Sequence, residues 1–131
     1  MTDLIKLKDA TQNLSILFVE DEIELLNQSV LFLEKLFLKV DKATNGIEAL
    51  ELYKTNNYDI VITDIQMPKM DGFELIEHIK TLNTQQKIII VTAYTDEKYI
   101  TKMNALDVLG YIHKPLDFHE ILLKLSECIE N

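Results

Sequence analysis

Acidic residues follow two apolar runs of this chain. Glu20 and Asp21 come directly after the run 16–19, and Asp64 follows the run 60–63. Carboxylates that gather at one place repel one another unless a cation lies among them. Ligands that are all oxygen atoms favour a hard divalent ion, so we expect a Mg²⁺ site, which Mn²⁺ can also fill.

Two further polar side chains come at the ends of later apolar runs. Thr92 ends the run that begins at residue 88, and Lys114 follows the run 109–112. A hydroxyl and an ammonium group beside a metal-bound carboxylate can bind the oxygens of a phosphoryl group. Asp64 is therefore the candidate nucleophile, with Thr92 and Lys114 as candidate phosphate contacts.

These residues can meet only if the apolar runs are neighbouring strands of one sheet. The pattern predicts five strands, alternating with five helices, at 16–19, 40–43, 60–63, 88–91 and 109–112. The strands are continuous apolar runs, which is typical of a parallel sheet covered on both faces. The predicted fold is therefore α/β. Ligands of such sheets bind beyond the carboxyl ends of the strands, where Asp64 and its companions would lie.

Capping residues mark where several of the helices begin. Three helices start with the spacing of a capping box: Asn45 with Glu48, Asp71 with Glu74, and Asp117 with Glu120. Asp21 and Glu24 share this spacing, so a cap is the alternative role for Asp21. The first predicted helix, over 22–38, has more apolar residues than one face can bury. It either lies deep or presents a patch to a partner or a second copy of the chain.

Composition limits the classes of protein to consider. The 131 residues fit one domain, which we place at 14–131 after an N-terminal extension at 1–13. A net charge of −9 argues against direct nucleic acid binding. The chain has no signal peptide or membrane-spanning run and a single cysteine, so we expect a cytoplasmic protein. Its three glycines are too far apart for a dinucleotide or nucleoside triphosphate phosphate loop.

The motifs and their order resemble the receiver domains of two-component response regulators. The resemblance covers about residues 14–129 and is carried by VEDE at 19–22, DIQMPKMDG at 64–72, VTAY at 91–94 and GYIHKP at 110–115. It implies a flavodoxin-like, doubly wound fold with strand order 2-1-3-4-5 and helices on both faces. It also implies a signalling domain that promotes only its own phosphorylation and dephosphorylation.

The resemblance assigns a role to each acidic residue. Asp64 matches the aspartate that accepts a phosphoryl group from the phosphohistidine of a histidine kinase or phosphotransfer domain, or from a small donor such as acetyl phosphate. Asp21, Asp64 and the main-chain carbonyl of Gln66 match the Mg²⁺ ligands. Glu20 matches the acidic residue that reaches the metal through water.

The resemblance also implies a switch. Thr92 and Lys114 match the residues that contact the phosphoryl group, and Thr92 and Tyr111 match the pair that moves after phosphorylation. The surface expected to change, where an effector protein or effector domain binds, is made by the fourth helix, the fifth strand and the fifth helix. The Lys114–Pro115 peptide bond matches a cis bond, and Tyr94 is placed to shield the phosphorylated aspartate from water.

Other functions are compatible with parts of this pattern. One is an interaction module on the same fold in which Asp64 is never phosphorylated. An aspartyl phosphatase of the haloacid-dehalogenase kind needs a second aspartate where Gln66 stands. A flavin carrier is disfavoured because the acidic segment 20–22 would repel the phosphate of the cofactor. A stand-alone protein and the front of a longer regulator both remain open.

Overall fold

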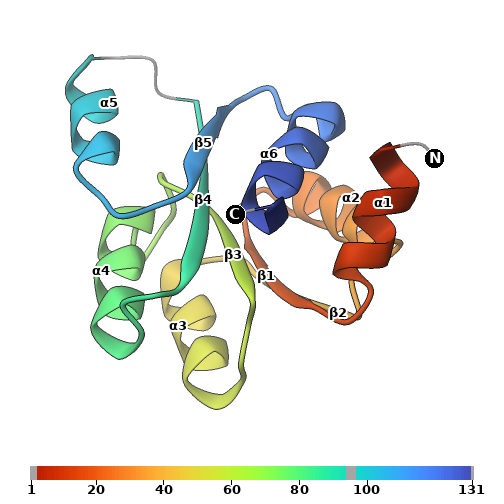
Figure 1. Ribbon diagram of the computed structural model, residues 1–131. Helices are drawn as coiled ribbons and strands as arrows, with labels where there is room; N and C mark the ends of the chain where they lie inside the picture. Colours follow the sequence, from red (N-terminus) through yellow and green to blue (C-terminus); the bar gives the residue numbers. More distant parts are fainter. Residues whose placement is uncertain (1–2, 94–96, 131) are drawn as a thin grey trace.

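The computed structural model describes residues 3–93 and 97–130 as a sheet between two layers of helices (Figure 1). Within these ranges the five strands are β1 Ser15–Val19, β2 Lys39–Ala43, β3 Ile60–Asp64, β4 Lys87–Thr92 and β5 Gly110–His113. The six helices in the same ranges are α1 Asp3–Thr11, α2 Ile23–Leu33, α3 Gly46–Thr55, α4 Gly72–Leu82, α5 Glu97–Asn104 and α6 Phe118–Glu130. Across those residues, none of the helices has the length and apolar character that a membrane crossing requires.

The sheet has the predicted topology. Its strands are all parallel and lie in the order β2-β1-β3-β4-β5. The pairing places Val19 of β1 beside Thr63 of β3, and Asp64 beside Val91 of β4. Thr92, at the end of β4, pairs with His113 at the end of β5. The carboxyl ends of four strands therefore meet at one edge of the sheet.

Each face of the sheet has its own apolar core. In Figure 1, α3, α4 and α5 lie on one side of the sheet, and α1, α2 and α6 lie on the other. Val61 and Ile88 belong to the first core, whereas Ile60 and Ile89 belong to the second. All four side chains are buried although successive residues point to opposite faces. Burial on both faces explains why β3 and β4 have no polar alternation.

Two of the predicted helix caps make the expected hydrogen bond, from the N–H of the glutamate to the side chain of the capping residue. The side chains of Asn45 and Asp71 accept hydrogen bonds from the N–H groups of Glu48 and Glu74, both at 2.9 Å. The other two differ from the prediction. The carboxylate of Asp117 accepts from the N–H of His119 instead of Glu120. Asp21 is not the cap of α2, because the N-cap residue is Glu22 and its side chain makes no capping bond.

The prediction of five helices misses α1, which lies within the segment treated as an extension. Leu7 of α1 is buried in the core formed with α2 and α6. The hydroxyl of Thr11 is also buried and donates to the main-chain carbonyl of Leu36 at 2.7 Å. The N-terminal segment is therefore packed onto the sheet domain.

The first predicted helix is shorter than expected. α2 ends at Leu33, while Leu36 and Phe37 remain buried in the turn that follows. Apolar spacing continued past the end of the helix because the turn folds back on the same core. Leu31 and Leu38 are 65% and 68% exposed, so this segment is partly deep and partly a surface patch.

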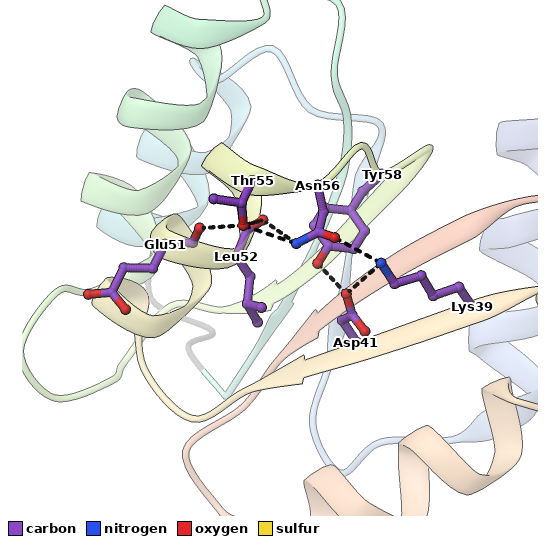
Figure 2. A network of polar contacts seen from close by, with 7 residues as sticks. All are labelled: Lys39, Asp41, Glu51, Leu52, Thr55, Asn56 and Tyr58. Atoms are coloured by element: carbon purple, nitrogen blue, oxygen red, sulfur yellow. Dashed lines mark hydrogen bonds and ion pairs between the residues drawn. The ribbon is translucent and has the colours of Figure 1, made fainter.

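A polar network joins the end of α3 to β2 (Figure 2). The hydroxyl of Tyr58 donates to the carboxylate of Asp41. The ammonium of Lys39 lies 3.3 Å from the same carboxylate and donates to the side-chain oxygen of Asn56 at 2.9 Å. The amide group of Asn56 in turn donates to the carbonyl of Leu52 in the last turn of α3. This network fixes the loop that leads into β3.

Candidate functional site

The predicted site residues converge at the carboxyl edge of the sheet. Glu20 and Asp21 follow β1, Asp64 and Thr92 are the last residues of β3 and β4, and Lys114 follows β5. A cavity of ≈ 470 Å³ opens there and is lined by Asp21, Asp64, Gln66, Met67, Pro68, Ala93 and Lys114. Asp21 and Lys114, which are 93 positions apart in the sequence, therefore line one pocket.

Lys114 connects the two buried carboxylates. Its ammonium nitrogen lies 2.7 Å from Oδ2 of Asp64 and 2.9 Å from Oε1 of Glu20. The N–H of Lys114 donates to the carbonyl of Thr92 at 2.8 Å, which fixes its main chain against the end of β4. The Lys114–Pro115 peptide bond is cis, as predicted. Lys114 is thus held so that its charge lies beside the candidate nucleophile.

Glu20 is an acid with very little contact with water, since only 1% of its surface is exposed. Oε2 accepts a hydrogen bond from the N–H of Glu22 at 3.0 Å, while Oε1 faces Lys114. Burial raises the pKa of Glu20 to about 7, and the nearby charge of Asp64 acts in the same direction. The N–H of Glu22 and the ammonium of Lys114 oppose that rise without cancelling it.

The charge of Lys114 is favoured by the same contacts. Burial by itself lowers the pKa of Lys114. Hydrogen bonds to Asp64 and Glu20, together with the negative charges of both carboxylates, outweigh burial and raise the pKa above its ordinary value. Lys114 therefore keeps a positive charge at the pocket across the neutral range.

The three acidic residues can hold a metal ion. Glu20, Asp21 and Asp64 each offer a carboxylate oxygen, and these oxygens lie within 4.8 Å of one another. Asp21 is exposed, whereas Asp64 is 5% exposed, so the set spans the wall and the opening of the pocket. Hard oxygen ligands at an accessible position fit Mg²⁺, which binds a few carboxylates and keeps several waters. Gln66 lines the same pocket, and the role of its carbonyl as a ligand stays a prediction.

The loop after β3 holds the acceptor through its main chain. The N–H of Ile65 donates to Oδ1 of Asp64 at 2.7 Å, and the N–H of Gly72 donates to the carbonyl of Ile65 at 2.7 Å. The hydroxyl of Thr63 donates to the carbonyl of Asp64 at 2.8 Å. No functional role for Thr63 is predicted from the sequence. The available signal was a hydroxyl residue at the end of an otherwise apolar run.

The expected switch residues have different surroundings. The Thr92 side chain is fully buried, while Tyr111 is half-buried and packs against the core on the α5 side of the sheet. Its ring makes an edge contact with His113 at a centroid distance of 5.5 Å. Tyr94, the predicted shield, lies outside the described residues. The movement of Thr92 and Tyr111 stays a prediction.

The fold and the pocket define a flavodoxin-like α/β domain with an acidic site at the carboxyl edge of its sheet. The model of the response regulator receiver domain matches residues 16–126, and the chain belongs to this family. This match confirms the resemblance that the motifs suggested. Receiver domains are signalling domains of two-component systems.

Curated relatives include both long and short proteins. The chain is 35% identical over 118 residues to the transcriptional regulatory protein ZraR of Klebsiella oxytoca, covering 90% of this chain and 27% of that protein. It is 33% identical over 114 residues to the chemotaxis protein CheY of Halobacterium salinarum, covering 87% and 95%. The chain thus spans about a quarter of the first relative and nearly all of the second.

Solved structures agree with the family. The CheX–CheY–BeF3–Mg²⁺ complex of Borrelia burgdorferi contains a chain that matches with a TM-score of 0.82 and 29% identity, covering 92% of both chains. The non-phosphorylated HemR receiver domain of Leptospira biflexa matches with a TM-score of 0.83 and 28% identity, covering 91% of this chain and 96% of that one.

Proposed function

We propose that this chain is a phosphoacceptor receiver in which Asp64 takes a phosphoryl group from a histidine kinase or phosphotransfer domain, or from a small phosphodonor. The observation that carries the proposal is the pair of Lys114 contacts, which gather Asp64 and Glu20 around one ammonium group. A lysine beside a carboxylate nucleophile at the mouth of a pocket suits the transfer of an anionic group.

The transfer is a single displacement at phosphorus. An oxygen of Asp64 attacks the phosphorus atom, a P–O bond forms, and the P–N bond to the donor histidine breaks. The imidazole leaves with the electron pair of that bond. It is a neutral ring when one of its two nitrogens carries a proton. Lys114, which pairs with Oδ2 of Asp64 in the structure, then pairs with a phosphoryl oxygen.

Mg²⁺ would supply charge neutralisation during this step. Asp21 and Asp64 would bind it directly with the carbonyl of Gln66, and Glu20 would reach it through water. The relative from Borrelia burgdorferi was crystallised with Mg²⁺ and BeF3, which supports the same chemistry here. The hydroxyl of Thr92 would donate to the phosphoryl group, and Tyr111 would follow its movement.

The expected consequence is a changed partner surface on α5, β5 and α6, from which an effector protein or an attached effector domain is recognised. We place this signalling in the cytoplasm and expect no direct nucleic acid binding. A homodimer is one form in which the chain can use this surface. The edge contact between Tyr111 and His113 on β5 supports this surface. The ammonium nitrogen of Lys102 in α5 lies 4.1 Å from the ring centre of Phe73 in α4.

Intact mass after incubation with acetyl phosphate and Mg²⁺ tests the proposal. The wild-type chain should gain one phosphoryl group, and Asp64→Asn should gain none because it lacks the nucleophile. Asp107→Asn is the matched control, since that carboxylate is 90% exposed and does not line the pocket. This variant should gain one phosphoryl group like the wild type. A wild-type chain that gains no phosphoryl group would point to the interaction module that is never phosphorylated.

A further inference from the structure

Thr63 is a polar residue in a place that suits an apolar one. It is fully buried and follows three buried apolar residues of β3. Valine has nearly the same shape as threonine and would fill this position without burying a hydroxyl group. A buried hydroxyl is tolerated when it makes a hydrogen bond, and Thr63 donates to the main-chain carbonyl of Asp64 at 2.8 Å.

The carbonyl that Thr63 binds shares a rigid plane with the group that holds the acceptor side chain. The carbonyl of Asp64 and the N–H of Ile65 belong to one peptide unit, whose atoms move together. That N–H donates to Oδ1 of Asp64 at 2.7 Å. A rotation of this peptide plane would therefore break the bond from Thr63 and misdirect the bond to Oδ1 at the same time.

The next segment of chain restricts the same peptide from its other side. The first residue of α4, Gly72, approaches so closely that an added Cβ would lie 2.3 Å from the carbonyl oxygen of Asp64. The N–H of Gly72 also donates to the carbonyl of Ile65 at 2.7 Å. The peptide after Asp64 is thus held between the hydroxyl of Thr63 and the start of α4.

We propose that Thr63 is a positioning residue for the acceptor. Its hydroxyl sets the plane of the peptide between Asp64 and Ile65, and this plane fixes Oδ1 so that Oδ2 faces Lys114 and the pocket. The same plane sets the direction of the chain into Gln66, whose carbonyl is the expected metal ligand. The consequence for phosphotransfer rests on the proposed function, whereas the control of the peptide plane does not.

Amide hydrogen exchange in metal-free protein tests the peptide plane directly. Thr63→Val should raise the exchange rate of the Ile65 N–H about tenfold, because its bond to Oδ1 loses the support of the hydroxyl. Thr63→Ser, which keeps the hydroxyl, should restore slow exchange. The exchange of Val19 and Ile90 in the neighbouring strands should stay as in the wild type.

The rate of phosphorylation by acetyl phosphate provides the second measurement. Thr63→Val should react about tenfold more slowly at saturating Mg²⁺ and donor, since a small misplacement of a reacting group is costly. Thr63→Ser should recover most of the rate. Thr11→Val is the matched control, because Thr11 also buries a hydroxyl that donates to a carbonyl, at 2.7 Å from Leu36, far from the pocket.

The outcomes separate positioning from packing. Urea unfolding tests whether each variant is folded. If Thr63→Val does not fold, Thr63→Ala takes its place. A variant without the hydroxyl that shows wild-type exchange at Ile65 and a wild-type rate would overturn the proposal, whatever its stability. If the wild type takes up no phosphoryl group, the proposed function fails, and the exchange rates at Ile65 still decide the role of Thr63.

Discussion

Two buried polar side chains of this protein, Glu20 and Ser29, differ in whether they have hydrogen-bond partners among the described residues. Glu20 is 1% exposed, yet both of its oxygens have donors, from Glu22 and Lys114. The hydroxyl of Ser29 in α2 is buried and lacks a hydrogen-bond partner among the described residues. An unpaired buried hydroxyl costs stability, because it has lost its hydrogen bonds to water without replacing them.

Replacing Ser29 by alanine should stabilise the protein. The substitution removes an unsatisfied hydroxyl and improves helix propensity, so we expect the free energy of unfolding to rise by about 1 kcal/mol. Urea unfolding at neutral pH measures the change. Ser126→Ala in α6, at a half-buried position, is the control and should change stability by less than about 0.5 kcal/mol. A loss of stability in Ser29→Ala would show that the hydroxyl has a partner in solution.

At the scale of elements, β1, β3 and β4 were predictable because they are buried on both faces and a polar residue ends or directly follows each of them. α1 was not, because its short sequence has no clear apolar face and depends on tertiary contacts at Leu7 and Thr11. The end of α2 was misplaced because Leu36 and Phe37 are buried by a turn. The pocket was predictable from residue types that follow strands, but the role of Thr63 depends on a hydrogen bond that no spacing reveals.

The network of Figure 2 predicts a pH dependence at the junction of β2 and the loop before β3. Burial, followed by the hydrogen bond to Asp41 and the charge of that carboxylate, raises the pKa of Tyr58 well above its ordinary value of 10.0. The stabilisation from Tyr58 is therefore fully present below pH 10 and is lost as pH rises toward the folded pKa. In that window the loss is about 1.4 kcal/mol per pH unit.

Tyr58→Phe tests this dependence. Below pH 10 the variant should be less stable than the wild type by about 1–2 kcal/mol, because a part-buried hydrogen bond to a charged acceptor is lost. Above pH 10 the difference should shrink, since phenylalanine cannot ionise in the unfolded chain. Urea unfolding at pH 8 and at about pH 11 measures both values. Asp41→Asn keeps an acceptor without its charge and should weaken the dependence; parallel curves for wild type and Tyr58→Phe would contradict the assignment.

For the whole molecule, the site exists only in the folded chain. Glu20, Asp64 and Lys114 come from distant segments that the parallel sheet brings together, and the chain as a whole has a net charge of −9. Bringing three carboxylates within 4.8 Å of one another opposes folding to the extent that the single ammonium of Lys114 does not neutralise them. Any ion that binds this set and not the unfolded chain therefore adds its binding free energy to the stability of the fold.

Magnesium should stabilise the entire domain. At a free Mg²⁺ concentration of about 100 times the dissociation constant, the free energy of unfolding should rise by about 2.7 kcal/mol. Urea unfolding in EDTA and in Mg²⁺, at constant ionic strength, measures the gain. Asp21→Asn should lose most of it because one charged ligand is removed, while Asp107→Asn, whose carboxylate is 90% exposed, should keep it. An equal shift in Asp21→Asn and the wild type would mean that Mg²⁺ acts through general screening of the acidic chain, because only a specific site distinguishes the two carboxylates.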